Sequence, residues 1–184
     1  KKTPKTVKKN GEEKRYMYTT YTNRKTMVVV LDACEKYPVG YAIGDHESPA
    51  LIREALRNAV QHTKELFGNR YKPLQLQSDN YQKKVMVPFY EAMTKYYTPA
   101  ALGNAKSKIV EPYFKRLNVE YCQKQANWSG FGITADKDNQ PNLEVLNQNH
   151  KFIPDEATVI AQLAAIIAQE RAKKIDAYRA AWER

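Results

Sequence analysis

Short apolar segments separated by turns make up the first part of the chain. RYMYTTYT at 15–22, TMVVVLDA at 26–33 and VGYAIGD at 39–45 are rich in β-branched and aromatic residues and have no helical period. A turn at 35–38 separates the last two segments. We therefore predict a strand over each segment and a β-hairpin formed by the second and third.

Two more strands are expected further along the chain. After Pro73, the run LQLQSD alternates apolar and polar residues, which predicts a strand that ends at Asp79. A short strand is also expected over 96–101.

The first helix has a clear start and a clear end. Ser48 is a favourable N-cap, Pro49 suits the first helical position, and Gly68 is a candidate C-cap. Between them, apolar residues recur at helical spacing. They are Leu51, Ile52, Ala55, Leu56, Ala59 and Val60.

Three later helices are predicted. The first covers 85–95, where Pro88 is tolerable only in the first turn. The second covers 105–117. The third is long and begins at Pro154-Asp155, after a polar stretch at 122–150 with no clear element. Its apolar face, which includes Leu163, Ile166 and Ile167, should dock onto the core or a partner, because isolated helices rarely persist in water.

The order of these elements predicts the fold class. Strands come first, and then helices and strands alternate before the long final helix. This is the pattern of an α/β protein with a mixed sheet flanked by helices.

Charge adds a candidate partner. The chain has a formal net charge of +10 and a pI near 9.5, which favours an anionic partner such as nucleic acid. A solvated lysine surface is the alternative. Residues 1–15 hold seven basic residues and read as a loop or arm with a turn at Asn10-Gly11.

Other signals narrow the class of protein. Cys34 and Cys122 are far apart and form no CxxC, so a disulfide scaffold or structural zinc site is not expected, and a reducing cytosol suits the chain. The three histidines, His46, His62 and His150, share no ligand spacing and read as ordinary residues. No apolar run is long enough to span a membrane.

Two acidic residues stand out by position. Asp79, followed by Asn80, ends a predicted strand, where ligands of α/β proteins usually bind. Glu111 shares one face of its predicted helix with Lys108 and Lys115, at spacings of three and four residues. Such a face suits a metal site that also meets phosphates, and it equally suits an ordinary solvated ion pair.

Three segments together resemble a known family. They are LDACEKYPVGYAIGDHES at 31–48, SDN at 78–80 and GNAKSKIVEPYF at 103–114. Their order and spacing resemble the catalytic core of DDE transposases and retroviral integrases, most of all phage Mu-type transposases. In that family a strand ends in Asp-Asn, and a helix 30–50 residues later carries a glutamate.

The resemblance implies a ribonuclease H-like fold and metal-dependent DNA cleavage and strand transfer. Asp79 and Glu111 would be catalytic carboxylates and ligands of two Mg²⁺ or Mn²⁺ ions. Transposon ends and target DNA would be the partners, and the protein would form a homo-oligomer on DNA in the bacterial cytoplasm, near the nucleoid. The residues expected to contact DNA, along with the basic arm, are Asn104, Lys106, Lys108, Lys115 and Arg116.

The third carboxylate of the family is the uncertain one. Asp32 is the obvious candidate, but only one predicted strand separates it from the first helix, where the family has two. We therefore expect the core, 16–121, to lack its first strand, with the missing aspartate before Lys1 and the chain inactive alone. Residues 122–184 would be a polar loop and helical extension. Asp32 as a true ligand remains the alternative.

Pro112 directly after Glu111 departs from the family pattern. A proline inside a helix removes a hydrogen bond and clashes with the preceding turn. Either the helix begins near Ile109, with Pro112 in its first turn, or it is kinked. A ribonuclease H-like nuclease and a non-catalytic DNA-binding or assembly module are the alternative functions.

Overall fold

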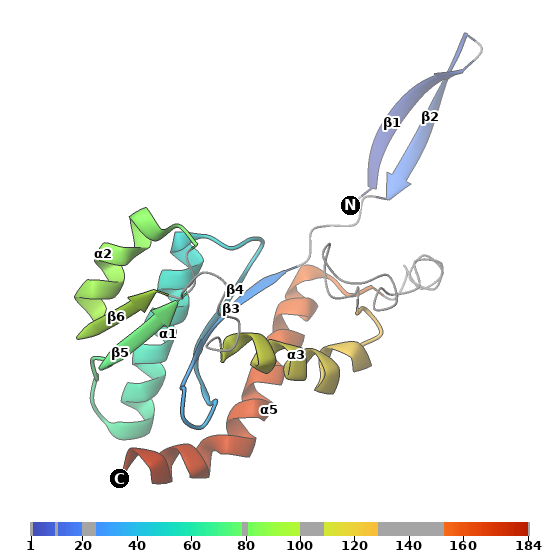
Figure 1. Ribbon diagram of the computed structural model, residues 1–184. Coiled ribbons are helices and arrows are strands. Elements are labelled where there is room, and N and C mark those ends of the chain that lie inside the picture. The colour runs from blue at the N-terminus through green and yellow to red at the C-terminus, as the bar shows by residue number, and fades with distance from the viewer. Residues whose placement is uncertain are drawn as a thin grey trace.

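The computed structural model describes residues 2–9, 11–19, 25–78, 81–99, 109–128 and 153–183. Within them, three two-stranded sheets combine with four α-helices and a 3₁₀ turn (Figure 1). The strands are β1 (Lys2–Lys9), β2 (Glu12–Thr19), β3 (Thr26–Leu31), β4 (Pro38–Gly44), β5 (Gln75–Ser78) and β6 (Tyr96–Pro99). The helices are α1 (Pro49–Phe67), α2 (Lys83–Met93), α3 (Val110–Glu120), η2 (Cys122–Lys124) and α5 (Glu156–Trp182).

The amino-terminal segment corrects one expectation. Residues 1–15 were expected to form a loop, and a strand was expected from Arg15. Instead β1 and β2 pair antiparallel from Lys2↔Thr19 to Lys9↔Glu12. The predicted turn is correct, since Gly11 lies between the strands with φ of +80°. Alternating Thr, Val and Tyr residues among the lysines supply the β propensity that the charge count concealed.

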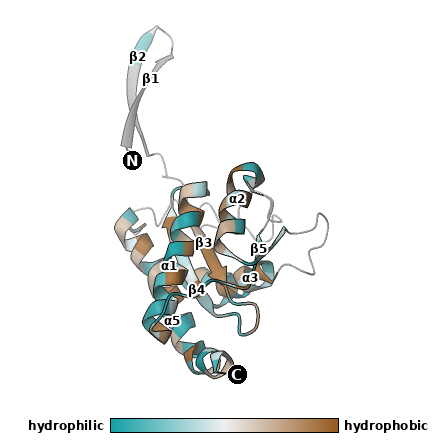
Figure 2. Ribbon diagram, turned by 90° about the vertical axis from the view of Figure 1, so that its left-hand side faces the viewer, coloured by the Kyte–Doolittle hydropathy of each residue, from teal (hydrophilic) through white to brown (hydrophobic). Residues whose placement is uncertain are grey.

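The predicted central hairpin is confirmed. β3 pairs antiparallel with β4 from Thr26↔Gly44 to Leu31↔Pro38, with an irregularity between Val30 and Leu31. β3 has apolar residues on both faces, as expected of a strand covered on both sides. Figure 2 shows this strand in the hydrophobic colour.

Helix α1 begins and ends as predicted. Ser48 accepts a hydrogen bond from the backbone N–H of Leu51 at 3.2 Å, and Pro49 is the first helical residue. Gly68 has φ of +81° and donates its N–H to the carbonyl of Lys64. The helix packs closely on β4: a Cβ on Gly40 would lie only 2.4 Å from the carbonyl oxygen of Ala55.

The third two-stranded sheet is a parallel pair. β5 and β6 pair from Gln75↔Tyr96 to Ser78↔Pro99, with α2 between them in sequence. The predicted strand starts were correct or nearly so. Helix α2 begins two residues earlier than expected, at Lys83, so Pro88 lies inside the helix and beyond its first turn.

Apolar side chains form layers on both sides of the β3–β4 hairpin. Val28 and Val30 pack with α1 and α2, while Met27, Val29 and Leu31 pack with α3 and α5. This alternation follows from the two-residue period of a strand. The fold is therefore mixed α/β, as predicted.

The prediction for the long final helix is confirmed. Ile166 and Ile167 of α5 are buried against Tyr113 and Leu117 of α3, with Leu163 at the margin. Asp155 caps the helix by accepting from the N–H of Thr158. The carboxyl end of α5 packs through stacked aromatic rings on α1, where Trp182 meets Phe67, and on the β3–β4 turn, where Tyr178 meets Tyr37.

Candidate active site

The carboxyl end of β5 is held by two tyrosines. The hydroxyls of Ser78 and Tyr97 lie 2.9 Å apart, and the Tyr81 hydroxyl donates to the carbonyl of Glu47 at 2.7 Å. These contacts fix the chain on both sides of Asp79 beside the amino end of α1. Asp79 and Asn80 themselves lie outside the described residues.

Glu111 lies in the first turn of α3 and is exposed. The helix begins at Val110, so Pro112 is its third residue and needs no intrahelical hydrogen-bond donor. Two arrangements were considered for Pro112. The structure has the one in which the helix begins near Ile109 and Pro112 lies in its first turn. A carboxylate in a first turn is also favoured by the helix dipole.

The expected DNA-contacting residues differ in their surroundings. Lys115 is exposed one turn after Glu111 on the same helix. Arg116 differs from Lys115 because its guanidinium already has two carboxylate partners. It donates to Glu120 at 2.7 Å and also to Glu170. Three further positions, Asn104, Lys106 and Lys108, lie outside the described residues.

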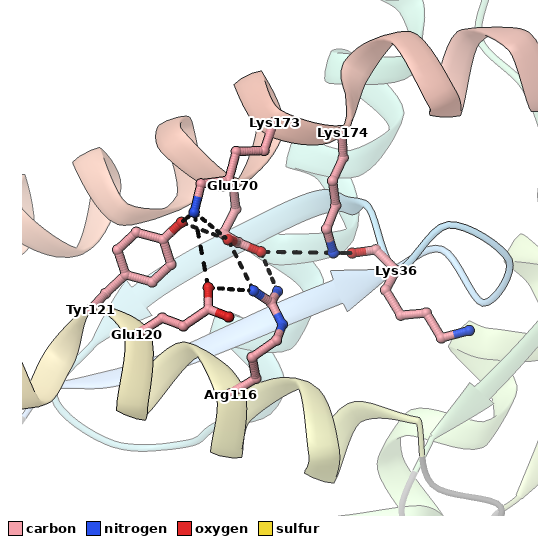
Figure 3. A network of polar contacts seen from close by, with 7 residues as sticks. All are labelled: Lys36, Arg116, Glu120, Tyr121, Glu170, Lys173 and Lys174. Atoms are coloured by element: carbon pink, nitrogen blue, oxygen red, sulfur yellow. Dashed lines mark hydrogen bonds and ion pairs between the residues drawn. The ribbon is translucent and has the colours of Figure 1, made fainter.

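A buried polar network ties α3 to α5 (Figure 3). Its centre is Glu170, whose side chain is fully buried. The carboxylate accepts from both terminal nitrogens of Arg116 and, at 2.7 Å, from the hydroxyl of Tyr121. Lys174 lies 3.7 Å from the same carboxylate and donates to the carbonyl of Lys36 at 2.8 Å. The network therefore links α3, α5 and the β3–β4 turn.

Electrostatics keeps Glu170 ionised. Burial alone would raise the pKa of its carboxyl, but the hydrogen bonds from Arg116 and Tyr121 outweigh it and hold the pKa below the usual range. Burial lowers the pKa of Lys174, and the nearby Arg116 adds to that effect. A carboxylate this deep in the protein is stable only because cations and donors surround it.

Tyr113 lies beside this network without joining it. Its ring is buried against α5, and its hydroxyl has no hydrogen-bond partner among the described residues. Burial, together with the nearby charge of Glu170, raises its pKa well above the usual range. The ring is packed by Arg116 and Lys174, whose charged groups lie 5.5 and 5.6 Å from its centroid.

Asp32 has a structural role in the β3–β4 turn. Its carboxylate accepts from the N–H of Glu35 at 2.7 Å, and its own N–H donates to the carbonyl of Tyr37 at 2.8 Å. Lys36 in this turn takes the left-handed conformation, with φ of 53°. Aspartate suits such a turn, because its short side chain can accept from nearby backbone N–H groups.

Asp32 and the end of β5 lie near opposite ends of α1. Tyr37, which pairs with Asp32, bonds His62 in the last turns of that helix, whereas Tyr81 bonds Glu47 just before its first turn. Ser48 and His62 are separated by about 21 Å along the axis at about 1.5 Å per residue. Asp32 therefore lies near one end of α1, and Tyr81 lies near the other.

The first turn of α3 lies on the same side of the fold as the β3–β4 turn, which contains Asp32. Tyr113 lies under Lys174, which bonds the carbonyl of Lys36. Asp79 lies outside the described residues, so the proximity of Glu111 and Asp79 stays a prediction.

Comparison of the chain with protein-family models, curated proteins and solved structures found no match.

Metal-site and membrane-span features were also compared with the predicted class of protein. In the described ranges, no group of three or more His, Cys, Asp and Glu residues is arranged to hold a metal ion. No helix among those residues is long and apolar enough to cross a membrane. Cys34 and Cys122 are both free thiols, as their spacing predicted.

Two titratable residues, His62 and Glu170, have structural roles that were not predicted from the sequence. His62 was treated as ordinary, yet its Nε2 lies 2.8 Å from the Tyr37 hydroxyl, and its ring stacks on that of Tyr37. Glu170 was not singled out. A signal was present, because Glu170 follows Ile166 and Ile167 at spacings of four and three, inside the apolar stripe.

Proposed function

We propose that this chain is part of the catalytic core of a DDE-type DNA transposase, which cuts DNA strands and joins a DNA 3′-hydroxyl to a target. The order of elements supports this proposal: an antiparallel hairpin, a helix, a parallel strand pair around a second helix, and a third helix with a glutamate. The observation that carries most weight is the start of α3 at Val110, which leaves Glu111 exposed in a first turn.

The metal ligands in this proposal are oxygen donors. Asp79 and Glu111 would hold Mg²⁺ or Mn²⁺, which prefer carboxylate and water oxygens. Bound divalent ions would supply stabilisation of the negative charge that develops on the attacked phosphate. The exposed position of Glu111 in the first turn of α3 fits this use. The carboxylate of Asp32 accepts a hydrogen bond within its own turn.

A third carboxylate would come from a strand beside β3. In the described part of the chain, β3 pairs only with β4, and β5 only with β6. All six residues of β3 are partly exposed even though helices cover both faces of the strand. A strand along the second edge of β3 would satisfy its backbone groups and complete a mixed sheet of the ribonuclease H type.

Phosphate contacts would come from the basic face near Glu111. Lys115 is exposed for this role, and we propose the same role for Asn104, Lys106 and Lys108. We assign Arg116 to the fold instead, because a guanidinium held by two carboxylates has little left to offer a phosphate.

One observation favours a second candidate, a non-catalytic module that binds DNA or assembles with other subunits. Among the described residues, Asp32 is committed to a turn and no three acidic groups converge. In that case the positive charge would serve binding alone.

Strand transfer separates the two candidates. The assay supplies the chain, with its native flanking sequence, a pre-nicked duplex end and Mn²⁺. We expect Glu111→Gln to reduce the product at least about 100-fold, since metal ligands are required for the chemistry. The matched control is Glu91→Gln, an exposed glutamate on α2, which should keep the wild-type yield. Undiminished product from Glu111→Gln would reject the catalytic assignment, and DNA binding without product under any metal would favour the module.

A further inference from the structure

We propose that the β1–β2 hairpin is a preformed ribbon that docks in the major groove of duplex DNA. The proposal deepens the DNA-binding part of the proposed function and does not depend on the chemistry.

The hairpin is a regular element that stands apart from the other helices and strands in Figure 1. Its two strands of eight residues pair along their whole length, from Lys2↔Thr19 to Lys9↔Glu12. Figure 1 shows the hairpin projecting away from the other elements. A lone two-stranded hairpin is only marginally stable in water, so a surface that covers it would stabilise it.

Charge identifies the kind of surface. Residues 2–19 contain six basic and two acidic residues, a net charge of +4 within a chain of +10. Both acidic residues, Glu12 and Glu13, lie beside the turn and are exposed. In the register of the hairpin they stand opposite Lys9 and Lys8. The two lysines and two glutamates beside the turn therefore sum to zero charge. The excess positive charge lies along the rest of the hairpin, which we call the stem.

The stem cations have neutral cross-strand neighbours. Lys5 is opposite Tyr16, Lys14 is opposite Val7 and Arg15 is opposite Thr6. In this register, no acidic residue stands directly opposite any of these three cations. A polyanion that runs alongside the stem would complement the excess positive charge of this part of the sequence.

Dimensions favour duplex DNA among polyanions. Eight residues span about 26 Å at about 3.3 Å per residue. The major groove of B-DNA is about 12 Å wide and admits a two-stranded β-ribbon. The major groove of A-form RNA is too narrow and deep for such an element. A membrane surface is disfavoured because the strands contain few large aliphatic residues.

Binding is measured by fluorescence anisotropy with a 30-base-pair duplex across a salt series, with EDTA present so that metal chemistry plays no part. The test variant carries Lys5→Gln, Lys14→Gln and Arg15→Gln. The matched control removes three exposed lysines from the body, Lys72→Gln, Lys84→Gln and Lys124→Gln. We expect the slope of log affinity against log salt to fall by about 2 to 3 for the hairpin variant, at about 0.9 per phosphate contact. The body variant should change the slope by less than half as much.

Groove and partner are tested separately. Methylation of guanine N7 by dimethyl sulfate should be reduced over about one helical turn by the wild-type chain, and this protection should be absent with a deletion of residues 1–19. The deletion leaves the elements from β3 onward intact in sequence, and circular dichroism checks that they are folded. Four outcomes would each overturn the proposal. Two are equal slope changes in the two triple variants and unprotected guanine N7. The others are equal hairpin-dependent binding to an RNA duplex and hairpin-dependent dimers without DNA. Because the assays contain no metal, a lack of strand transfer would leave them unaffected.

Discussion

Arg116 on α3 and Glu170 on α5 form a two-point ion pair in which both terminal guanidinium nitrogens reach the carboxylate. The two partners differ in exposure: the Glu170 side chain is fully buried, whereas 35% of the Arg116 side chain is exposed. The pair therefore joins a buried charge to a partner that still reaches solvent.

This difference predicts unequal costs for removing each partner. Arg116→Met leaves a buried carboxylate that keeps only Tyr121 and the more distant lysines, and we expect it to lower the free energy of unfolding by about 3 to 5 kcal/mol. Glu170→Gln should cost less, because Arg116 keeps Glu120 and solvent. Urea unfolding measures both changes.

Glu120→Gln is the matched control for this pair. Glu120 also bonds Arg116, but 40% of its side chain is exposed, so its loss should cost no more than about 1 kcal/mol. An equal cost for all three variants would contradict the account of the network.

The same network shows what the sequence could and could not predict. Local signals were sufficient for α1, because Ser48, Pro49 and Gly68 act through bonds to their own neighbours. The docking face of α5 was likewise predictable from the spacing of Ile166 and Ile167. The partner of Glu170 was not, because it depends on which residue of α3 crosses α5 at that point.

Charge misled the prediction at the amino end. Residues 1–15 read as a loop because lysines dominate the composition, yet their register in β1–β2 depends on cross-strand backbone bonds that composition does not reveal. The candidate site is the least predictable part. The start of α3 could be narrowed to two arrangements from Pro112, but the distance from Glu111 to Asp79 depends on tertiary packing.

Low pH should reduce the free energy of unfolding because Glu170 becomes protonated. Its pKa lies below the ordinary value of 4.5 in the folded protein, so unfolding takes up a proton as the pH falls through that range. The stabilisation is therefore complete above about pH 4.5 and is lost as the pH falls through the lower folded pKa. The free energy of unfolding, measured from pH 6 to pH 3, should decline more steeply in the wild type than in Glu170→Gln. Parallel curves would show that folding does not lower the pKa of Glu170.

His62 predicts a second, separate pH dependence. Burial, aided by the nearby charge of Arg171, lowers its pKa from the ordinary value of 6.5, so the folded protein disfavours the charged ring. Stability should therefore begin to fall below about pH 6.5 and stop changing once the pH is below the folded pKa. His62→Gln should remove this step. The chemical shifts of the His62 ring protons, followed by NMR between pH 8 and pH 4, report the pKa directly, and a value above 6.5 would contradict the prediction.

Close packing of α1 on β4 makes Gly40 sensitive to substitution. A Cβ there would lie 2.4 Å from the Ala55 carbonyl oxygen and 2.6 Å from the Cβ of Ala59, so Gly40→Ala must separate the helix from the strand. We expect a loss of about 1 to 3 kcal/mol in urea unfolding. Gly44→Ala is the control, because its Cβ would meet only the end of the Leu51 side chain, at 3.0 Å. A smaller loss at Gly40 than at Gly44 would show that the helix can shift freely.

Asp32→Asn tests whether this residue belongs to the turn or to the site. An amide oxygen can still accept from the N–H of Glu35, so we expect a change in stability below about 1 kcal/mol. Strand-transfer yield should stay within about twofold of the wild type in the assay used for Glu111. Complete loss of product with an intact fold would return Asp32 to the set of metal ligands.

The central claim is that Asp79 and Glu111 share one metal site, and the most direct test is the anomalous diffraction of crystals soaked in MnCl₂. We predict a manganese peak in contact with both carboxylates, with the two side chains within about 10 Å of each other, as a pair of ions about 4 Å apart requires. A structure in which the two carboxylates lie on opposite faces of the protein, with no manganese between them, would contradict the account.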